Sequence, residues 1–212
     1  PKQILMDLDD VDPNGVFEDQ TLGGAGNFTL NGAGVSGGVW TTPDGFAKQI
    51  GFESTGNISG VTFTVTGYAD AAKNIPLVES LSGPNNGTVE TAGYFYHITS
   101  IAAGAAVGTN TEAGPVDEAV SQIIPLNWRG GTVALNVTVT GTVNYTVQQT
   151  FDDVQNVDNH PLDWDDHDDT NLVGASTTLN GNYIAIPRAM RVKVNSYSSG
   201  AALTINVSQS DV

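Results

Sequence analysis

The chain contains no cysteine, and this absence removes several classes of chemistry at once. Neither a disulfide framework, a thiolate metal site nor a cysteine nucleophile can be built. Cations are also scarce, since seven Lys and Arg stand against 23 Asp and Glu and give a formal net charge of −16 at pH 7. Such a surface repels the phosphates of nucleic acids and of anionic membranes, so we expect neither as a partner.

Long apolar segments and strong helix formers are scarce as well. No run approaches the roughly 20 apolar residues of a membrane-spanning helix, and residues 1–3 lack the apolar region of a signal peptide. We therefore expect a protein that is assembled in a cytoplasm. Gly, Thr, Val and Asn dominate instead, which is a composition typical of short strands joined by tight turns.

Alternation of apolar and polar residues predicts the strands. In residues 61–66 it places Val61, Phe63 and Val65 on one face and threonines on the other. Three pairs of runs are expected to form hairpins: 61–66 with 76–81, 132–140 with 142–151, and 189–196 with 201–209. About ten strands at this spacing predict an all-β protein, an antiparallel β-sandwich or a jelly-roll-like fold.

The division of the chain follows changes in composition. Residues 1–26 are acidic and rich in turn formers, and they predict an extended N-terminal arm that reaches onto a neighbouring molecule. Residues 27–110 and 111–212 are predicted to form two parts of the β-sandwich. The polar segment 109–118 marks either the boundary between them or a long loop within one domain.

Asp10, Asp12 and Asn14 match the first half of a calcium-binding EF-hand loop, in which oxygens at alternate positions point at one cation. The second half fails because Thr21 stands where a chelating Glu is expected, although Glu18 would supply one oxygen. A turn that exposes its charges explains the same residues, and we favour it over calcium. No other cofactor is expected.

A second acidic cluster lies between residues 152 and 169, with His160 and His167 among its carboxylates. A hard cation or a transition metal is one interpretation of this mixture. A solvated loop is favoured, because so many like charges without nearby Lys or Arg repel one another. The carboxylates are Asp152, Asp153, Asp158, Asp163, Asp165, Asp166, Asp168 and Asp169.

Catalytic motifs find little support in the sequence. There is no Gly-x-Ser-x-Gly elbow, and His97, which alternates with its neighbours in a predicted strand, has no paired nucleophile. Residues 32–37 match a Gly-x-Gly-x-x-Gly pattern, but a dinucleotide site needs a helix there and strand or loop residues follow. We therefore predict a protein that is not an enzyme.

Large aromatic side chains leave two interpretations open. They could form a platform on which sugar rings stack, or they could anchor the core and protein interfaces, where such residues contribute most. The second interpretation is favoured. The residues are Trp40, Trp128, Trp164, Tyr94 and Tyr96.

Several phrases, taken in order, resemble a widespread group of structural proteins from the virions of tailed bacteriophages. The likeness spans nearly the whole chain and rests on the order and spacing of the phrases together. The phrases are QTLGGAGNFTLNG (20–32), GVTFTVTG (60–67), IPLNW (124–128), GTVNYTVQQTFDD (141–153) and MRVKVNSYSSG (190–200). The acidic run 163–169 departs from the group.

The resemblance implies a non-enzymatic virion component, foremost a capsid cement or decoration protein that stabilises the phage head, with a neck or tail protein as the alternative. It implies the major capsid protein or other virion proteins as partners, a location in the virion, and a homotrimer or another homo-oligomer. A further alternative, from a different class, is a carbohydrate-binding module of a receptor-binding protein.

Overall fold

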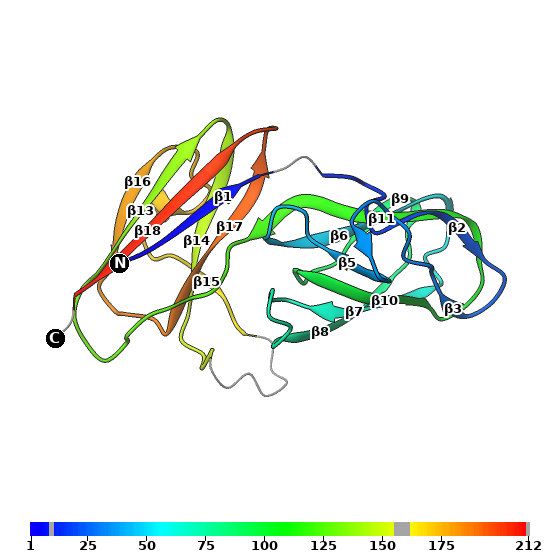
Figure 1. The fold of residues 1–212 in the computed structure, drawn as a ribbon, viewed down its shortest axis with the longest axis horizontal. Coiled ribbons are helices and arrows are strands. Elements are labelled where there is room, and N and C mark those ends of the chain that lie inside the picture. Colours follow the sequence, from blue (N-terminus) through cyan, green and yellow to red (C-terminus); the bar gives the residue numbers. More distant parts are fainter. Residues whose placement is uncertain (9–10, 155–161, 211–212) are drawn as a thin grey trace. The chain divides into compact units, whose positions relative to one another are not determined.

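The computed structural model describes residues 1–8, 11–154 and 162–210, which form strands and one short 3-10 helix (Figure 1). The predicted fold class is confirmed: the chain is all-β, its sheets are antiparallel and their packing is sandwich-like. The chain divides into two compact units. Unit 1 comprises Pro1–Asp10 and Val120–Val212, and unit 2 comprises Val11–Ala119.

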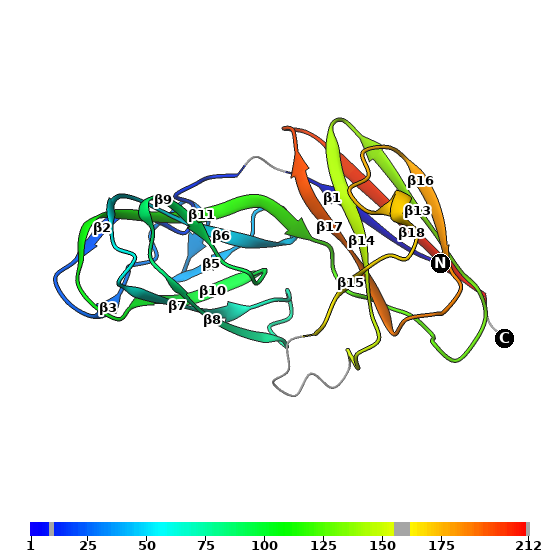
Figure 2. The same ribbon diagram turned by 180° about the vertical axis from the view of Figure 1, so that it is seen from behind.

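Unit 1 consists of two layers, which Figures 1 and 2 show from opposite sides. One sheet has the strand order β1-β18-β13-β16, and the other has the order β15-β14-β17 with β12 beside β17. The elements are β1 (Lys2–Asp7), β12 (Ile124–Pro125), β13 (Val133–Thr140), β14 (Val143–Thr150), β15 (Asp165–Asp166), the 3-10 helix η1 (Thr170–Leu172), β16 (Leu179–Tyr183), β17 (Ala189–Tyr197) and β18 (Ala202–Gln209).

The period of two that predicts these strands also builds the core of unit 1. Alternate residues of each long strand are buried between the layers, and their neighbours point outward. The inward side chains include Val133, Leu135 and Val137 of β13, Val192 and Val194 of β17, and Leu203, Ile205 and Val207 of β18.

Two predicted hairpins of unit 1 are wrong, although their strands exist. β13 pairs with β18 and β16, whereas β14 pairs with β17 and β15. The chain therefore crosses between layers after β13 and again after β17. Gly141 and Gly200, with φ of 77° and 72°, supply the left-handed turns at these crossings.

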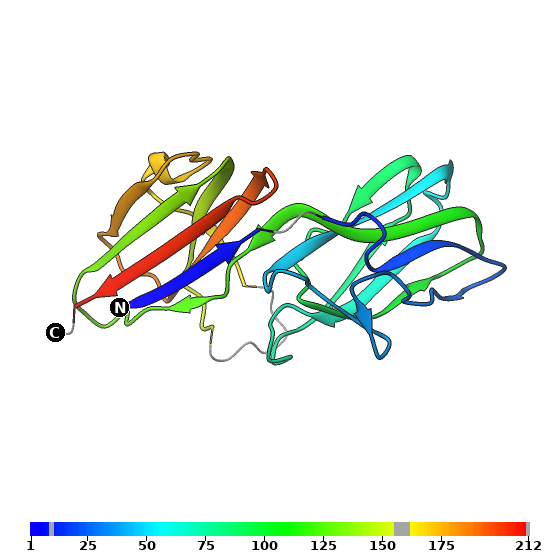
Figure 3. The same cartoon turned by 45° about the horizontal axis from the view of Figure 1, so that its top comes forward.

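The predicted N-terminal arm is also wrong. β1 pairs antiparallel with β18 over six residues, from Lys2 opposite Val207 to Asp7 opposite Ala202, and Figure 3 shows the two strands side by side. Met6 and Leu8 are fully buried in unit 1. The sequence did not predict this short strand, because it is followed by acidic turn residues. The average composition of residues 1–26 therefore resembles that of a linker.

Unit 2 also has two sheets. One has the order β4-β5-β10-β7-β8 with β3 beside β10, and the other contains β11-β6-β9 with β2 beside β11. The strands are β2 (Phe17–Leu22), β3 (Gly26–Asn27), β4 (Val35–Ser36), β5 (Val39–Thr41), β6 (Ala47–Asn57), β7 (Thr62–Tyr68), β8 (Pro76–Ser82), β9 (Asn85–Glu90), β10 (His97–Ala103) and β11 (Val107–Val120).

The remaining predictions for this unit have mixed outcomes. The hairpin of 61–66 with 76–81 is confirmed as β7 and β8, which pair from Thr62 opposite Ser82 to Tyr68 opposite Pro76. The polar segment 109–118 is neither a loop nor the boundary, because it lies inside β11. The division between the units falls at the end of that strand, between Ala119 and Val120.

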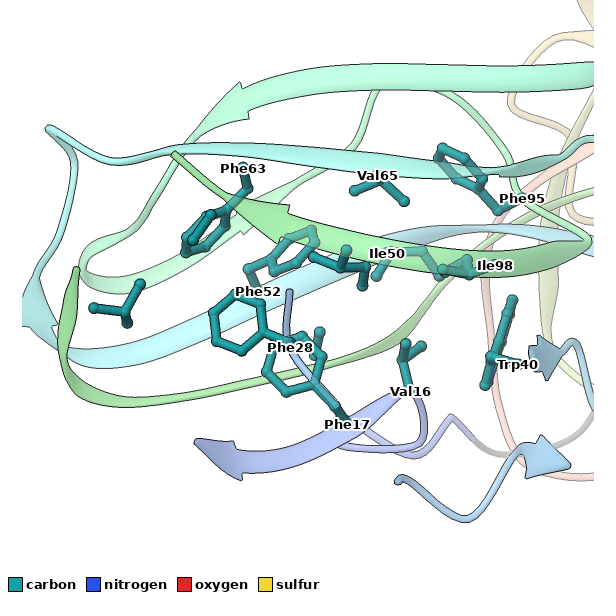
Figure 4. Close-up of a cluster of buried hydrophobic side chains, with 14 of the residues drawn as sticks. Val16, Phe17, Phe28, Trp40, Ile50, Phe52, Phe63, Val65, Phe95 and Ile98 are labelled. Atoms are coloured by element: carbon teal, nitrogen blue, oxygen red, sulfur yellow. The ribbon is translucent and has the colours of Figure 1, made fainter. Parts of the chain in front are cut away.

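Phenylalanine rings fill the centre of unit 2 (Figure 4). Phe17 stacks on Phe28 with ring centroids 4.4 Å apart, and Phe28 meets Phe63 edge-on at 5.6 Å. Phe52 lies 5.2 Å from Phe63 and 6.3 Å from Phe17, which closes the cluster. The cluster joins residues from both sheets, so it fixes their packing.

A buried ion pair lies beside this core. Lys48 Nζ contacts Asp44 Oδ2 at 2.8 Å, and both side chains have zero exposure. Thr42 Oγ1 and the backbone N–H of Phe46 donate to Asp44 Oδ1 at 3.0 and 3.1 Å. The carboxylate is thus held by donors on either side, which offsets the cost of removing two charges from water.

The register of β1 predicts effects of very different size at two neighbouring positions. Met6→Ala should lower the free energy of unfolding by about 2–5 kcal/mol, because it leaves a cavity in the core of unit 1. Leu5→Ala is the matched control, since Leu5 is 61% exposed and its loss should cost less than about 0.5 kcal/mol. Urea denaturation measures both changes, and equal effects would contradict the position of β1.

The buried ion pair predicts an asymmetric response in unit 2. Asp44→Ala should destabilise the protein by about 3–5 kcal/mol, because it leaves the charge of Lys48 buried without its carboxylate. Replacing both partners, with Asp44→Leu and Lys48→Met, should cost much less. Denaturation of both variants, with Glu90→Ala at an exposed site as the control, tests this order. A double variant less stable than Asp44→Ala would refute the argument.

Candidate interaction surfaces

The residues of the EF-hand-like motif form a tight turn. Asp10 lies outside the described residues. The backbone N–H of Asn14 donates to Asp12 Oδ1 at 3.4 Å, and that of Gly15 donates to the Asp12 carbonyl at 2.9 Å. Asp12 therefore uses its oxygens within the turn, as in the Asx turn that the sequence analysis favours. The calcium hypothesis stays untested for the complete motif.

Asp12 belongs to a larger group of carboxylates on unit 2, which we call the acidic face: Asp12, Asp19, Glu53 and Glu112. Asp19, Glu53 and Glu112 come from neighbouring strands, because β2 pairs with β11 and β6 lies on the other side of β11, and Asp12 lies in the turn that precedes β2. Burial, followed by the charges of Asp19 and Glu53, raises the pKa of Glu112 above its usual range. Over the described part of the chain, no three His, Asp or Glu side chains are arranged to hold a metal ion.

The second acidic cluster is divided among separate contacts. Asp158 and His160 lie outside the described residues. Asp152 Oδ2 accepts from the backbone N–H of Asp163 at 2.8 Å, and Asp153 lies 3.5 Å from Arg188. Asp165 and Asp166 form β15 at the edge of β14, while Asp169 caps η1. The described carboxylates thus structure a loop instead of converging on one point.

His167 is the exception within this loop, because its side chain is only 5% exposed. Its Nδ1 accepts from the backbone N–H of Asp169 at 3.0 Å, and its ring lies 4.6 Å from that of Tyr183. Burial lowers the pKa of His167, against the smaller raising effects of Asp168 and Asp169. Burial of the ring therefore favours the neutral form of the imidazole over the charged form.

The candidate aromatic residues occupy several environments. Trp40 is 1% exposed and belongs to the core of unit 2, as the favoured interpretation requires. The hydroxyl of Tyr94 donates to Glu118 at 2.9 Å, and the ring of Tyr96 lies 4.8 Å from that of His97. These three side chains are engaged within the protein and present no common platform for sugar rings.

All three arginines of the chain lie over the rings of the two other tryptophans. Arg129 and Arg188 lie over the ring of Trp128 at 5.1 and 5.0 Å, and Arg191 lies over Trp164 at 4.3 Å. Trp128 is 48% exposed. Stacking on the indole faces orients the guanidinium groups while their charge stays at the surface.

Phe151 adds an apolar side chain to this region. It is 55% exposed and directly follows Thr150, whose carbonyl accepts from the backbone N–H of Arg188 at 2.9 Å. We call Trp128, Arg129, Phe151 and Arg188 the tryptophan–arginine patch. Exposed aromatic and arginine side chains are the types that dominate the binding energy of protein interfaces.

A row of amide side chains crosses the outer surface of the sheet β1-β18-β13-β16. Gln3, Asn206, Asn136 and Asn180 stand directly opposite one another on the four strands. Gln3 Nε2 donates to Asn206 Oδ1 at 2.9 Å, Asn206 Nδ2 to Asn136 Oδ1 at 3.4 Å, and Asn136 Nδ2 to Asn180 Oδ1 at 2.8 Å. The amides therefore orient one another across the whole sheet.

Small residues, most of them polar, surround this row together with the exposed side chain of Leu5. We call the outward side of the sheet the amide face; Asp7, on β1, is the single charged residue in its alternating outward positions. Its other residues include Thr204 and Ser208 of β18, Ala134 and Thr138 of β13, and Asn182 of β16. A shallow cavity of about 470 Å³ lies over the row, between Lys2 at β1 and Gly181 at β16.

The amide face is not predicted by the sequence. Asn136 and Asn206 lie in segments correctly predicted as strands, whereas Gln3 lies in the predicted arm and Asn180 in a segment for which no strand is predicted. The four positions meet only through the pairing of strands distant in sequence. The available signal was Asn in place of Lys or Glu at outward positions of alternating runs. It indicates an unusual surface without indicating which residues share it.

The buried His167 predicts a pH dependence of stability. Its pKa in the folded state lies below its unfolded value of 6.5, so its contribution is present above pH 6.5 and is lost as the pH falls through the folded pKa. The free energy of unfolding should fall more steeply with acidification in the native chain than in His167→Gln, by at most about 1.4 kcal/mol per pH unit. Parallel profiles in urea denaturation between pH 7 and pH 5 would contradict this.

Comparison with known proteins assigns no function to these surfaces. No protein-family model matches the chain, and no curated protein matches it either. Among the described residues, no helix has the length and apolar character needed to cross a membrane.

Proposed function

We propose that this chain is a non-enzymatic structural protein of a tailed-phage virion, which acts by packing flat sheet surfaces against other virion proteins. The observation that carries the proposal is the amide face. On a chain of net charge −16, one whole sheet surface has a single carboxylate among its outward residues. The sequence resemblance to phage virion proteins supports the same function.

The physical argument rests on desolvation. Charged residues are depleted at the centres of protein interfaces, because removing a charge from water is costly. Amide and hydroxyl groups cost less to bury, and each can both donate and accept. Over the row Gln3, Asn206, Asn136 and Asn180, the mutual hydrogen bonds already fix the side chains, so a partner orders them at little entropic cost.

A capsid decoration protein fits these properties best. Such a protein is present at high local concentration before it binds, and strong net charge keeps separate copies apart while an uncharged surface remains available. We propose a homotrimer on the shell, in contact with the major capsid protein. A neck or tail component would use the same surface and differs in copy number.

Binding of a neutral carbohydrate is the second candidate, and the cavity over the amide row favours it. Amides are suited to sugar hydroxyls because they offer donors and acceptors together. The residues lining the cavity include no aromatic side chain on which a sugar ring would stack. The packing function therefore remains the stronger proposal.

Quantitative mass spectrometry of purified virions tests the proposal directly. A decoration protein should be present in copies comparable to the major capsid protein, whereas a neck or tail protein should be present as one ring. Absence from the particle, together with retention of neutral glycans by the purified chain, would replace the proposal with the carbohydrate function.

The amide face also predicts the effect of added charge. Asn180→Asp with Asn206→Asp keeps side-chain volume but places carboxylates on the face, and it should weaken binding to particles that lack the protein by about tenfold or more. Asn85→Asp with Asn110→Asp makes the same change in charge at exposed positions of unit 2 and is the control. Co-sedimentation with the particles measures both, and equal binding would exclude the amide face as the contact surface.

A further inference from the structure

We infer that the tryptophan–arginine patch of one copy docks on the acidic face of a second copy, so that the chain associates head to tail. This inference rests on the proposed function, since it specifies how copies contact one another within an assembly. It is carried by the chemistry of the patch and by charge complementarity within a single chain.

The first observation is how the chain uses its few cations. Unit 2 contains two lysines, Lys48 and Lys73, and Lys48 is buried against Asp44. Unit 1, by contrast, places both Arg129 and Arg188 over one exposed indole ring. This is the place among the described residues where two guanidinium groups share one exposed tryptophan ring.

The second observation is that the acidic face belongs to a unit whose sequence has two lysines and no arginine, and one of these lysines is buried. Asp19 and Glu53 are exposed, and Glu112 lies beside them on β11. Their mutual repulsion is a cost that an arriving guanidinium group relieves. The planar fork of arginine donates to carboxylates in pairs, and its stacking on Trp128 already limits its rotamers.

The occupant is another copy of the chain because the two surfaces are complementary and differ from each other. Association between unlike surfaces is heterologous: it closes into a ring when the rotation between copies permits and otherwise extends. A closed ring of three copies gives the trimer proposed above. Asp153, 3.5 Å from Arg188, sits at the edge of the patch and competes for one guanidinium group.

Charge reversal on each surface provides the test, with the full chain studied by sedimentation velocity. The patch variant carries Arg129→Glu and Arg188→Glu, and the face variant carries Asp19→Lys and Glu53→Lys. Each should associate at least about tenfold more weakly than the native chain at physiological ionic strength, where the long-range repulsion between copies of net charge −16 is screened. Arg191→Glu, which removes the arginine on Trp164, is the control and should associate like the native chain.

Mixing the two variants makes the test independent of misfolding. The patch variant keeps an intact acidic face and the face variant keeps an intact patch, so a mixture should form one-to-one dimers that neither forms alone. Recovery of dimers supports the head-to-tail contact. Native chains that remain monomeric at physiological ionic strength, variants that associate like the native chain, or a mixture without dimers would each overturn it.

Two further outcomes distinguish a failure of the head-to-tail contact from a failure of the proposed virion function. If the patch variant still enters virions at native copy number and its self-association is unchanged, the head-to-tail contact is wrong while the structural role stands. If the native chain associates as described but is absent from purified virions, the contact stands and the virion function is wrong.

Discussion

Scarcity of positive charge is the constraint on which the other features of this protein depend. With seven cations against 23 carboxylates, most acidic groups cannot be paired and remain in water. The cations are used where position matters: Lys48 neutralises a buried carboxylate, and the arginines lie on tryptophan rings. Surfaces suited to close packing therefore have to be uncharged, as the amide face is, or locally cationic.

The sequence predicts local structure here and leaves the pairing of strands undetermined. Alternation in residues 133–139 predicts β13 and its buried side correctly. It does not show that β13 pairs with β18 and β16. Two consecutive alternating strands can bury their apolar sides either as neighbours in one sheet or as members of two facing sheets. Gly141 marks a turn in both arrangements, so the glycine alone does not distinguish them.

The N-terminal strand was hidden from prediction because the average composition of residues 1–26 differs from that of its first eight residues. Met6 and Leu8 lie in a segment whose acidic residues and turn formers resemble a linker, yet two buried side chains and one paired strand are enough to anchor it. Among the candidate site residues, Asp12 and Asn14 form the turn that their spacing predicts. His167 shows the reverse case, since its acidic neighbours indicated a solvated loop while its own ring is buried against Tyr183.

The pairing of β1 with β18 has a consequence for how the chain folds during synthesis. Unit 1 is discontinuous in sequence, with unit 2 inserted between β1 and the rest of its strands. The ribosome completes unit 2 while β1 still lacks its partner, so β1 is among the last strands of unit 1 to find its place. Its backbone hydrogen-bonding groups are unpaired during that interval and are available to the β18 of another nascent chain. Two nascent chains held close together could therefore exchange β1 before either closes its own sheet.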